Sequence, residues 1–321
     1  MIRLKYKAPL ENEEKDISNY VQHVTWSGDS EQSARKIDFS IAYNTPEKDR
    51  VFIPIDLKLG GVISVFVDEM NIFQGRIFYR KRASEGYSFE FTCFDDAIYL
   101  AKSNIRAIIS GTVPAAIKQV CNEVGIPVGN MPEMNASVNF IADDRSCSEV
   151  IRMILDYQSA ADGNQYLPVS INGKLNIVKK GELITDYIAT ADTNIMTAEH
   201  SESIEDMVNR IKAVDESGNV MQIFSNDDDV KSYGILQQIY KMQPAKPGET
   251  VDNVKAAKAK LKKQKDESSL KGIGNIQCIT GWAITVKEEQ LKGTFYIKSD
   301  THEFENGNHT MTLTLEYMEE T

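Results

Sequence analysis

The sequence predicts a mainly β fold of the α+β class, in which two related β-barrel regions flank a small α+β domain. Three observations lead to this prediction. Period-two alternation fills the first hundred residues, two helical stripes follow between about residues 110 and 160, and strand patterns return after residue 205. A chain of 321 residues is long enough for two or three domains, and it buries about three quarters of its unfolded surface without needing disulfides.

The first region, residues 1–100, is expected to be a small antiparallel barrel or sandwich. Ile37, Phe39 and Ile41 alternate with polar residues, which predicts a strand with one buried and one exposed face. Turn signals separate this strand from others of the same kind, and no long helix lies between them. The further strands are expected over 62–67, 73–79 and 89–94, with turns at 68–71 and 85–86.

The pattern changes to helices within the second region, residues 101–204. Thr112 caps an expected helix with Pro114 in its first turn, and an apolar stripe runs from there to Gly125. A second helix begins at Ser146 and Glu149, which have the spacing of a capping box. A hairpin over 167–178, turning at Asn172 and Gly173, completes a compact α+β domain.

Strands return in the third region, residues 205–321, which we expect to be the second barrel. Residues 210–214 and 220–224 flank a turn, and 235–242 is another strand candidate. A proline-bearing linker over 243–248 leads into a helix over 251–265, so this region carries a helical insertion over about 249–270. Three aspartates at 227–229 indicate the start of one short helical turn that Gly234 closes.

An internal repeat relates the first and third regions. The first contains Ile63-Ser-Val65, then Phe73-Gln-Gly75-Arg-Ile77-Phe78-Tyr79, then Phe89-Glu-Phe91-Thr92. The third contains Ile284-Thr-Val286, then Leu291-Lys-Gly293-Thr-Phe295-Tyr296-Ile297, then Met311-Thr-Leu313-Thr314. A hairpin of similar length follows a glycine-bearing strand in both, which indicates two related barrels in one chain.

Charge and composition exclude several classes of function. The 36 basic and 47 acidic residues give a net charge of −11, and the deficit is spread along the chain, so specific binding of nucleic acid is not expected. The first fifteen residues are charged throughout and lack the apolar stretch of a secretory signal, and no run is long enough for a membrane helix. We therefore expect no membrane insertion by this chain. The four cysteines show no metal-binding spacing and are expected to be reduced and buried.

Four separated motifs carry a resemblance to a known family. They are Trp26-Ser-Gly28-Asp29 with Ala34-Arg35-Lys36-Ile37-Asp38-Phe39, Ile126-Pro-Val-Gly-Asn130, Tyr233-Gly-Ile-Leu-Gln237, and Asp300-Thr-His302-Glu-Phe304-Glu-Asn306-Gly307-Asn-His309-Thr-Met311. In this order they resemble the XkdQ/YqbQ family, the hub or late-control D type proteins of contractile phage tails and phage-derived bacteriocins. The similarity covers nearly the whole chain.

The resemblance implies a structural baseplate hub. In such a family three chains, each with two tube-like barrels, form a homotrimeric pseudo-sixfold ring that joins the hexameric tail tube to the threefold central spike and touches other baseplate proteins. It implies localisation in a virion or tail-like particle that is assembled in the bacterial host cytoplasm. No cofactor, metal or catalytic residue is implied, and no peptidoglycan hydrolase domain is recognisable in the sequence.

A metal hydrolase is the main enzymatic alternative. With a two-residue turn at Asn306 and Gly307, Phe304 faces His309 across the hairpin, and His302 lies on the same face as His309. A catalytic zinc needs three protein ligands, and no third ligand is available, so we expect histidines packed at a hairpin end or at a subunit contact. A cell-wall hydrolase or a glycan-binding module stays the alternative to a hub, although only Tyr157, Tyr166 and Tyr187 offer an aromatic platform in the middle region.

A lysine-rich segment is the most asymmetric feature of the sequence. Lys255, Lys258 and Lys262 belong to an expected helix with a narrow apolar stripe, and three more lysines surround it. A solvated surface helix is one interpretation, and a surface that docks an acidic neighbour is the other. Acidic pairs such as Asp95 and Asp96 could in principle act as an acid and a base or bind calcium. Adjacent carboxylates in a strand point apart, however, so we expect these pairs in solvated turns or at helix starts.

Overall fold

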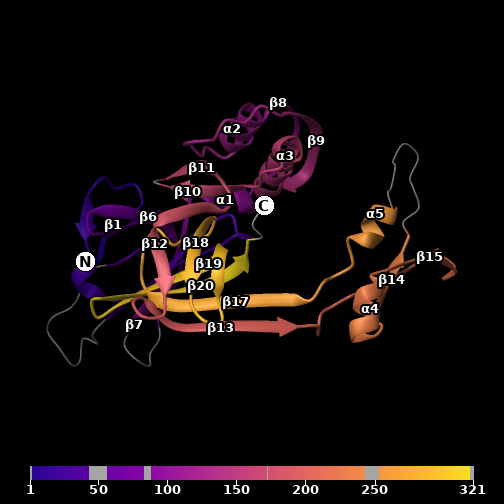
Figure 1. Ribbon diagram of the computed structural model, residues 1–321. Coiled ribbons are helices and arrows are strands. Elements are labelled where there is room, and N and C mark those ends of the chain that lie inside the picture. Colours follow the sequence, from indigo (N-terminus) through magenta and orange to yellow (C-terminus); the bar gives the residue numbers. More distant parts are fainter. Residues whose placement is uncertain (1, 43–55, 83–87, 172, 243–252, 319–321) are drawn as a thin grey trace. The chain divides into compact units, whose positions relative to one another are not determined.

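The protein is described by a computed structural model that covers residues 2–42, 56–82, 88–171, 173–242 and 253–318 (Figure 1). The turn expected at 85–86, Asn172 and the linker expected over 243–248 lie outside these residues. The chain divides into two compact units, residues 1–199 with 269–321 and residues 200–268. No helix among the described residues is both long and apolar enough to cross a membrane.

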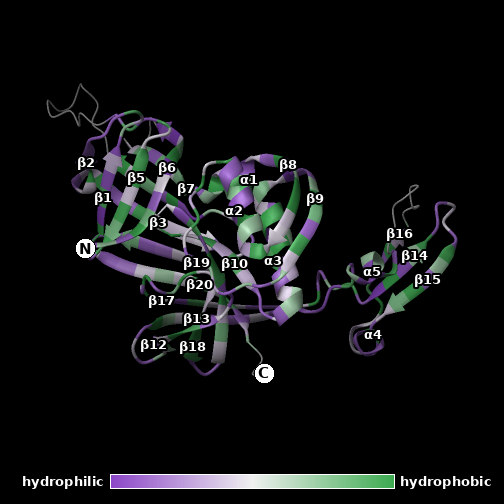
Figure 2. Cartoon of the chain, turned by 90° about the horizontal axis from the view of Figure 1, so that it is seen from above, coloured by the Kyte–Doolittle hydropathy of each residue, from purple (hydrophilic) through white to green (hydrophobic). Residues whose placement is uncertain are grey.

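The larger unit is built on a sheet of thirteen strands. Apolar and polar residues interleave along these strands, as the period-two patterns predict (Figure 2). The first seven are β1 (Ile2–Lys7), β2 (Glu14–Asp16), β3 (Val21–Asp29), β4 (Lys36–Ala42), β5 (Val62–Val67), β6 (Met70–Arg82) and β7 (Ser88–Asp95), with a short 3-10 turn over Ser18–Tyr20. The others are β12 (Glu182–Thr190), β13 (Ile195–Ser203), β17 (Lys265–Ile273), β18 (Trp282–Lys287), β19 (Lys292–Glu305) and β20 (Asn308–Tyr317).

The sheet consists of two repeats with the same strand order. Neighbours run β3-β4-β7-β6-β5-β1 in the first repeat and β13-β17-β20-β19-β18-β12 in the second. The corresponding strands also follow one another in the same order along the chain. The internal repeat predicted from the sequence is therefore present in the topology. One direction differs, because β1 is antiparallel to β5 whereas β12 is parallel to β18.

A bulge fixes how the two repeats correspond. The pairing of β6 with β7 skips one residue between Ile77 and Tyr79, and the pairing of β19 with β20 skips one between Ile297 and Ser299. Ile77 therefore corresponds to Ile297, so the sequence alignment that equated Gly75 with Gly293 is two residues out of register. A slip of two preserves which face each side chain occupies, so the alternating pattern does not reveal it.

Each repeat has its own apolar core. The first core contains Leu4, Ile37 and Ile63, which are at most 1% exposed, and the second contains Leu270, Ile284 and Leu313, which are fully buried. Two barrel-like halves with separate cores thus share one continuous sheet, because β3 of the first repeat pairs with β19 of the second. The mainly β fold of the α+β class is confirmed.

The α+β part follows β7 within the same unit. It comprises α1 (Ala97–Lys102), β8 (Asn104–Thr112), α2 (Val113–Glu123), β9 (Ser137–Ser146), α3 (Cys147–Asp162), β10 (Tyr166–Ile171) and β11 (Lys174–Lys179). The helices α2 and α3 pack against the β8–β9 ribbon through fully buried residues such as Val120 and Ile151 (Figures 1 and 2). Ser146 and Glu149 form the predicted capping box at the start of α3, and the predicted β10–β11 hairpin is present.

The sequence analysis assigned residues 182–203 to the middle domain, but the strands there, β12 and β13, both pair within the second repeat.

The smaller unit, residues 200–268, is inserted between the neighbouring strands β13 and β17. Its sheet of β14 (Arg210–Val214), β15 (Val220–Ser225) and β16 (Gln237–Lys241) is separate from the large one. Local alternation identified these strands correctly but carries no information about which sheet they join.

Two short helices accompany this small sheet. The expected turn of helix is α4 (Asp227–Tyr233), which Asn226 caps by accepting the backbone N–H groups of Asp228 and Asp229. The helix predicted over 251–265 is too long, since α5 covers only Asn253–Lys258 and β17 begins at Lys265. Four of the six expected lysines therefore lie outside the helix. They are Lys260, Lys262, Lys263 and Lys265.

Candidate functional site: the junction between the two repeats

Two of the four family motifs, those that begin at Trp26 and Asp300, meet where β3 pairs with β19. This antiparallel pairing runs from Asp29 opposite Ser299 to His23 opposite Glu305. It is possible because β19 is fourteen residues long, so one edge pairs first with β18 and then, beyond Ile297, with β3. Among the described residues, this is the only strand pairing that links the two repeats.

A buried ion pair lies at the start of this junction. The guanidinium of Arg35, just before β4, donates to both carboxylate oxygens of Asp300, with 2.9 Å between Nη1 and Oδ1 and a still shorter contact between Nη2 and Oδ2. The backbone N–H and the hydroxyl of Thr280 each donate to Oδ1 of Asp300 at 2.7 Å. Burial raises the pKa of Asp300, but the charge and hydrogen bonds of Arg35, together with Thr280, outweigh this effect and hold the pKa below its usual value.

Three neighbouring residues, Trp26, Gly28 and Asp95, surround Arg35 and allow its ion pair with Asp300. Its guanidinium carbon lies 4.2 Å from the centroid of the Trp26 ring, in a cation–π contact. A Cβ at Gly28 would collide with Nη1 of Arg35, so a side chain at this position of β3 would displace the guanidinium. The backbone N–H of Arg35 donates to Asp95 at 3.0 Å.

Asp95 is a correction to the expectation of a solvated turn. It is 3% exposed, and it accepts the N–H groups of Arg35 and Ala97, whereas Asp96 does precede α1 as expected. Burial raises the pKa of Asp95 to about 7, although both N–H donors and the Arg35 charge lower it. Two adjacent carboxylates thus have different environments, because Asp95 is buried at the end of β7 whereas Asp96 is half-buried at the start of α1.

The two histidines form the next layer along β19. His302 faces Met311 and Phe304 faces His309, as the two-residue turn predicts. Nε2 of His302 lies 3.1 Å from the carbonyl oxygen of Cys278, and its Nδ1 lies 3.0 Å from Nε2 of His309. A carbonyl only accepts, so His302 donates from Nε2, and its neutral Nδ1 accepts from Nε2 of His309.

The environment keeps both imidazoles neutral. Burial lowers the pKa of His302 to about 4, against the favourable charge of Asp300, and burial likewise lowers the pKa of His309 to about 4. The ring of His302 packs on Trp26 and the ring of His309 on Phe304, with centroids 5.1 and 4.2 Å apart. Both nitrogens of His302 are used, and no group of three possible metal ligands occurs among the described residues.

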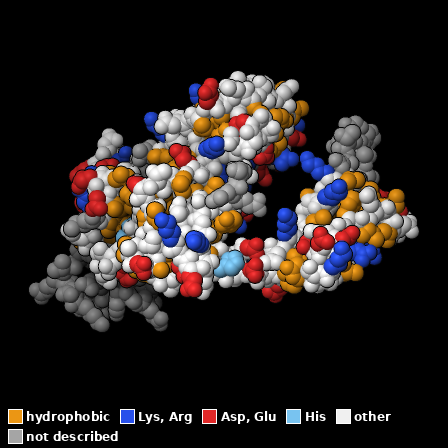
Figure 3. All heavy atoms as spheres, viewed as in Figure 1, with side chains coloured by type: hydrophobic (Ala, Val, Ile, Leu, Met, Phe, Trp, Pro, Cys, Tyr) orange, Lys and Arg blue, Asp and Glu red, His pale blue; other side chains and the backbone are white. Residues whose placement is uncertain are grey.

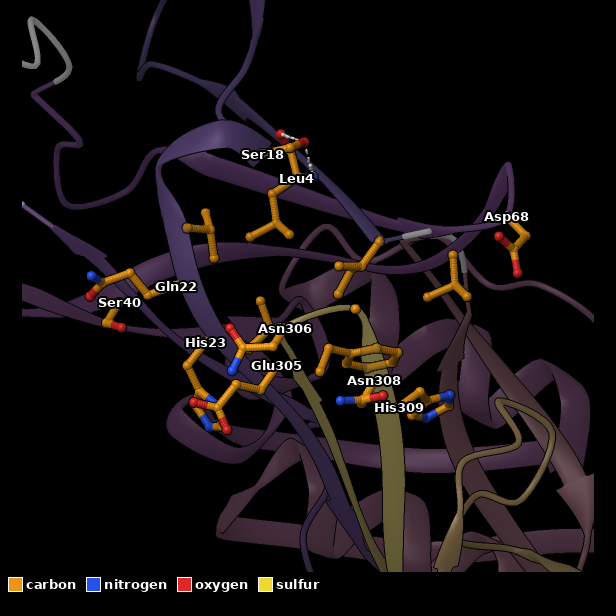
Figure 4. Close-up of a pocket in the computed structure, with 16 residues that line it drawn as sticks. Leu4, Ser18, Gln22, His23, Ser40, Asp68, Glu305, Asn306, Asn308 and His309 are labelled. Atoms are coloured by element: carbon orange, nitrogen blue, oxygen red, sulfur yellow. Dashed lines mark hydrogen bonds between the residues drawn. The ribbon is translucent and has the colours of Figure 1, made fainter. Parts of the chain in front are cut away.

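The hairpin turn at Asn306 and Gly307 forms one wall of a pocket of about 880 Å³ (Figure 4). Both residues have positive φ, 51° and 78°, as a two-residue hairpin turn requires. Leu4 and Phe304 contribute apolar surface to the pocket, and His23 and Glu305 lie near each other at its edge. The pocket is lined by carboxylate, amide, imidazole and hydroxyl groups, the hydroxyls being those of Ser18 and Ser40.

The three lysines proposed for docking belong to the smaller unit. Lys255 and Lys258 lie in α5, whose Ala257 is buried in the core of this unit, and Nζ of Lys258 lies 5.8 Å from the Phe224 ring. Lys262 forms a backbone bridge with Val208. On the face drawn in Figure 3, basic and acidic side chains are interspersed. The lysines therefore do not form a single helical face.

Sequence reasoning missed Thr280 and the carbonyl of Cys278, which hold Asp300 and His302. Both lie in the loop before β18, where no local pattern marks them. All four cysteines are buried and free, as expected, and burial raises the pKa of Cys278 to about 12. The motif residues were selected by their resemblance to the family, and the contacts that they make were not predicted.

Known proteins with related sequences and folds identify the family. A model described as YqbQ-like matches residues 24–316. Two relatives from Bacillus subtilis strain 168 are the uncharacterized protein YqbQ, 25% identical over 75% of this chain and 76% of the relative, and the phage-like element PBSX protein XkdQ, 22% identical over 91% of each.

Solved structures show the same fold at low sequence identity. The 43 kDa tail protein of prophage MuSo2 from Shewanella oneidensis has a TM-score of 0.69 at 11% identity, with 98% of this chain and 97% of that chain covered. The tail protein from Neisseria meningitidis MC58 has a TM-score of 0.64 at 11% identity, with 98% and 96% covered. Because the family match spans residues 24–316, which is most of the chain, the protein belongs to the YqbQ-like family.

Proposed function

We propose that this protein is a structural hub of a contractile phage tail or phage-tail-like particle, without enzymatic activity. The observation that carries the proposal is the pair of repeats with one strand order, joined edge to edge in a single sheet. A chain with two equivalent barrel-like halves supplies six such halves when three copies form a ring. This arrangement suits a protein that continues a sixfold tube and accepts a threefold spike.

The relatives support a place in the tail. XkdQ is a protein of a phage-like element, and the Shewanella and Neisseria structures are tail proteins. An Escherichia coli component of a type VI secretion system, described as similar to tail proteins gp27 and gp5 of bacteriophage T4, has a TM-score of 0.52 with 94% of this chain and 74% of that chain covered, at 11% identity. The proposed partners are accordingly two further copies of the chain, the tail tube, and spike or baseplate proteins.

The smaller unit provides a second contact surface in this proposal. Lys255 and Lys262 are exposed on its surface, and an acidic neighbouring baseplate or tube protein would bind there. Reversing both charges, with Lys255→Glu and Lys262→Glu, should reduce incorporation into particles without changing the oligomeric state of the purified chain. Reversal of Lys118 on α2, which is also exposed, is the matched control.

The test of the hub proposal is the symmetry of the assembled chain. Light scattering and negative-stain microscopy should show a trimeric ring, either in the purified protein or, if assembly requires the tube as template, in purified tail particles that contain it. Particles should lose their baseplate end when the chain is deleted. A chain that is absent from the particles, or present in them as anything other than a ring, would disprove the proposal.

A further inference from the structure

A second pocket, of about 410 Å³, lies in the larger unit and shares no lining residue with the pocket at the hairpin turn. Its walls include Trp26 and Arg35 from the junction, residues 70–72 at the start of β6, residues 182–186 of β12, and part of the loop before β18. One water molecule takes up about 30 Å³ of liquid, so this pocket is large enough for an amino-acid side chain with part of its backbone.

Three polar atoms of the lining residues have no hydrogen-bond partner in the described part of the chain. They are Nε1 of Trp26, Nε of Arg35 and Oδ1 of Asn71, and each atom is buried. Trp26 is 3% exposed and Arg35 is 8% exposed, and N–H groups buried so deeply normally have a partner. Two donors and one acceptor at a single pocket therefore mark a place where another molecule completes the hydrogen bonding.

The charges at this pocket favour a neutral or basic ligand. The guanidinium of Arg35 is already paired with Asp300, so its Nε offers a donor without an uncompensated positive charge. The other charged lining residues are Glu182 and Asp186, which are exposed and form no ion pair with a described residue. These carboxylates repel an anion and favour a peptide carbonyl inside the pocket with a basic group beside it.

The wall formed by β12 adds backbone groups that lie outside the regular ladder. The pairing of β12 with β18 passes from Leu183 opposite Ala283 to Ile188 opposite Thr285, which is five residues along β12 but only two along β18. The extra residues form a bulge, and residues 184–186 of this bulge line the pocket. An extended segment that enters the pocket can form backbone hydrogen bonds with this wall.

Apolar side chains make up much of the remaining lining. They are contributed by the start of β6, by β12 and by the loop before β18, and include Ile72, Leu183, Ile279 and Trp282. A surface of this kind accepts an aliphatic side chain, whose burial is favourable in proportion to the apolar area removed from water.

We propose that this pocket, the Trp26 pocket, binds an extended segment of a partner protein in which an aliphatic residue lies next to a basic one. Backbone carbonyl groups of the segment accept from Trp26 and Arg35, and a backbone N–H group donates to Asn71. Wall side chains must shift before a ligand reaches these shielded atoms, and the exposed side chains of Met70 and Leu183 are free to do so. The inference rests on the proposed function for the source of the segment, which is another protein of the tail particle.

The two tryptophans of the chain provide a direct readout. They are Trp26 and Trp282, and both line the pocket. The probe is the peptide N-acetyl-leucyl-lysine methylamide, which is titrated into the full chain labelled with nitrogen-15. In Trp282→Phe one indole N–H signal remains, that of Trp26, and we expect it to move in a saturable manner because this N–H gains an acceptor.

Two changes of the probe test the chemistry of the ligand. Glycine in place of leucine removes the aliphatic side chain, and glutamate in place of lysine brings a further carboxylate to Glu182 and Asp186. Each change should weaken binding at least about fivefold. A signal that does not move at about 10 mM peptide, or that moves equally with all three peptides, would overturn the proposal.

Matched variants of the chain locate the site. Leu183 and Ile188 lie on the same strand and are both 42% exposed, but only Leu183 lines the pocket. Leu183→Ala should therefore weaken binding of the lysine peptide about fivefold, whereas Ile188→Ala should leave it unchanged. Asp186→Lys and Asp192→Lys form a second pair, in which Asp192 is exposed but outside the lining. Equal effects within both pairs would show that the peptide binds elsewhere.

The source of the segment is tested in purified particles. Particles with Asp186→Lys should retain this chain and its ring but contain less of one other tail protein, as measured by quantitative mass spectrometry, and Asp192→Lys should change nothing. An unchanged composition, or a Trp26 signal that moves with protein concentration alone, would disprove a partner from the tail. Peptide binding by a chain that forms no ring would contradict the hub proposal and leave the pocket chemistry standing.

Discussion

Arg35 and Asp300 are 265 residues apart in the chain and form a two-point ion pair in which Asp300 is fully buried. This pair connects the entry of β4 in the first repeat with β19 in the second. The hydroxyl of Thr280 donates a further hydrogen bond to Asp300, and the ring of Trp26 packs against the guanidinium of Arg35. The two-point geometry of this ion pair therefore fits one register of the first repeat against β19.

Removing one partner of this pair should destabilise the larger unit strongly. Arg35→Met leaves the Asp300 carboxylate buried without its counter-ion, which we expect to lower the free energy of unfolding by about 3–5 kcal/mol. The double variant Arg35→Met with Asp300→Leu should recover a large part of this loss. Denaturant unfolding followed by tryptophan fluorescence measures both. Equal loss in the single and double variants would mean that the buried carboxylate is not the source of the effect.

Gly28 should tolerate no side chain. Gly28→Ala places a methyl group against the Arg35 guanidinium, and we expect a loss of about 1–3 kcal/mol in the free energy of unfolding. Ser27→Ala, the neighbouring change on the other face of β3, is the control and should have a much smaller effect. The same unfolding experiment provides the measurement. If both variants are equally stable, the close approach at Gly28 does not restrict the strand.

The histidine pair should make stability depend on pH. Because the pKa of His302 and of His309 is lowered to about 4 in the folded protein, the unfolded chain binds more protons between about pH 6.5 and 4. This contribution to stability is complete above pH 6.5 and is lost as the pH falls toward 4. Asp95, whose pKa is raised to about 7, acts in the opposite direction.

The contribution of the histidines is isolated by a variant. His309→Gln keeps a donor for Nδ1 of His302 but does not titrate, so the difference in unfolding free energy between pH 7.5 and pH 5 should be smaller than in the unchanged protein. His23→Gln is the control, since this histidine lies outside the pair and contacts Thr25 instead. An unchanged pH dependence in His309→Gln would contradict the assignment.

The purified chain should contain no stoichiometric zinc and should not digest cell wall. His302 bonds to His309 and to the Cys278 carbonyl, so binding of a metal would require breaking this network. Elemental analysis and zymography on peptidoglycan measure both properties. Cell-wall hydrolysis that disappears in His302→Ala, with the fold retained, would show that the pair is catalytic.

The sequence alone was sufficient for several of the local elements and for the existence of a repeat. Alternation marked β4 to β7, the Ser146–Glu149 spacing marked the start of α3, and Asn306 with Gly307 marked the turn of the last hairpin. Each of these signals depends on residues within a few positions of one another. The physical preferences that produce them, side-chain period, capping and positive φ, act over that same range.

Only the tertiary structure decided the partners of these elements. The pairing of β3 with β19, the burial of Asp95 beside Arg35, and the assignment of β14 to β16 to a separate unit all depend on contacts between distant segments. The true register of the repeat was hidden for the same reason, since a shift of two residues keeps every side chain on its face. Long-range pairing is determined by edge geometry and by buried charges such as Asp300, whose partner no local pattern identifies.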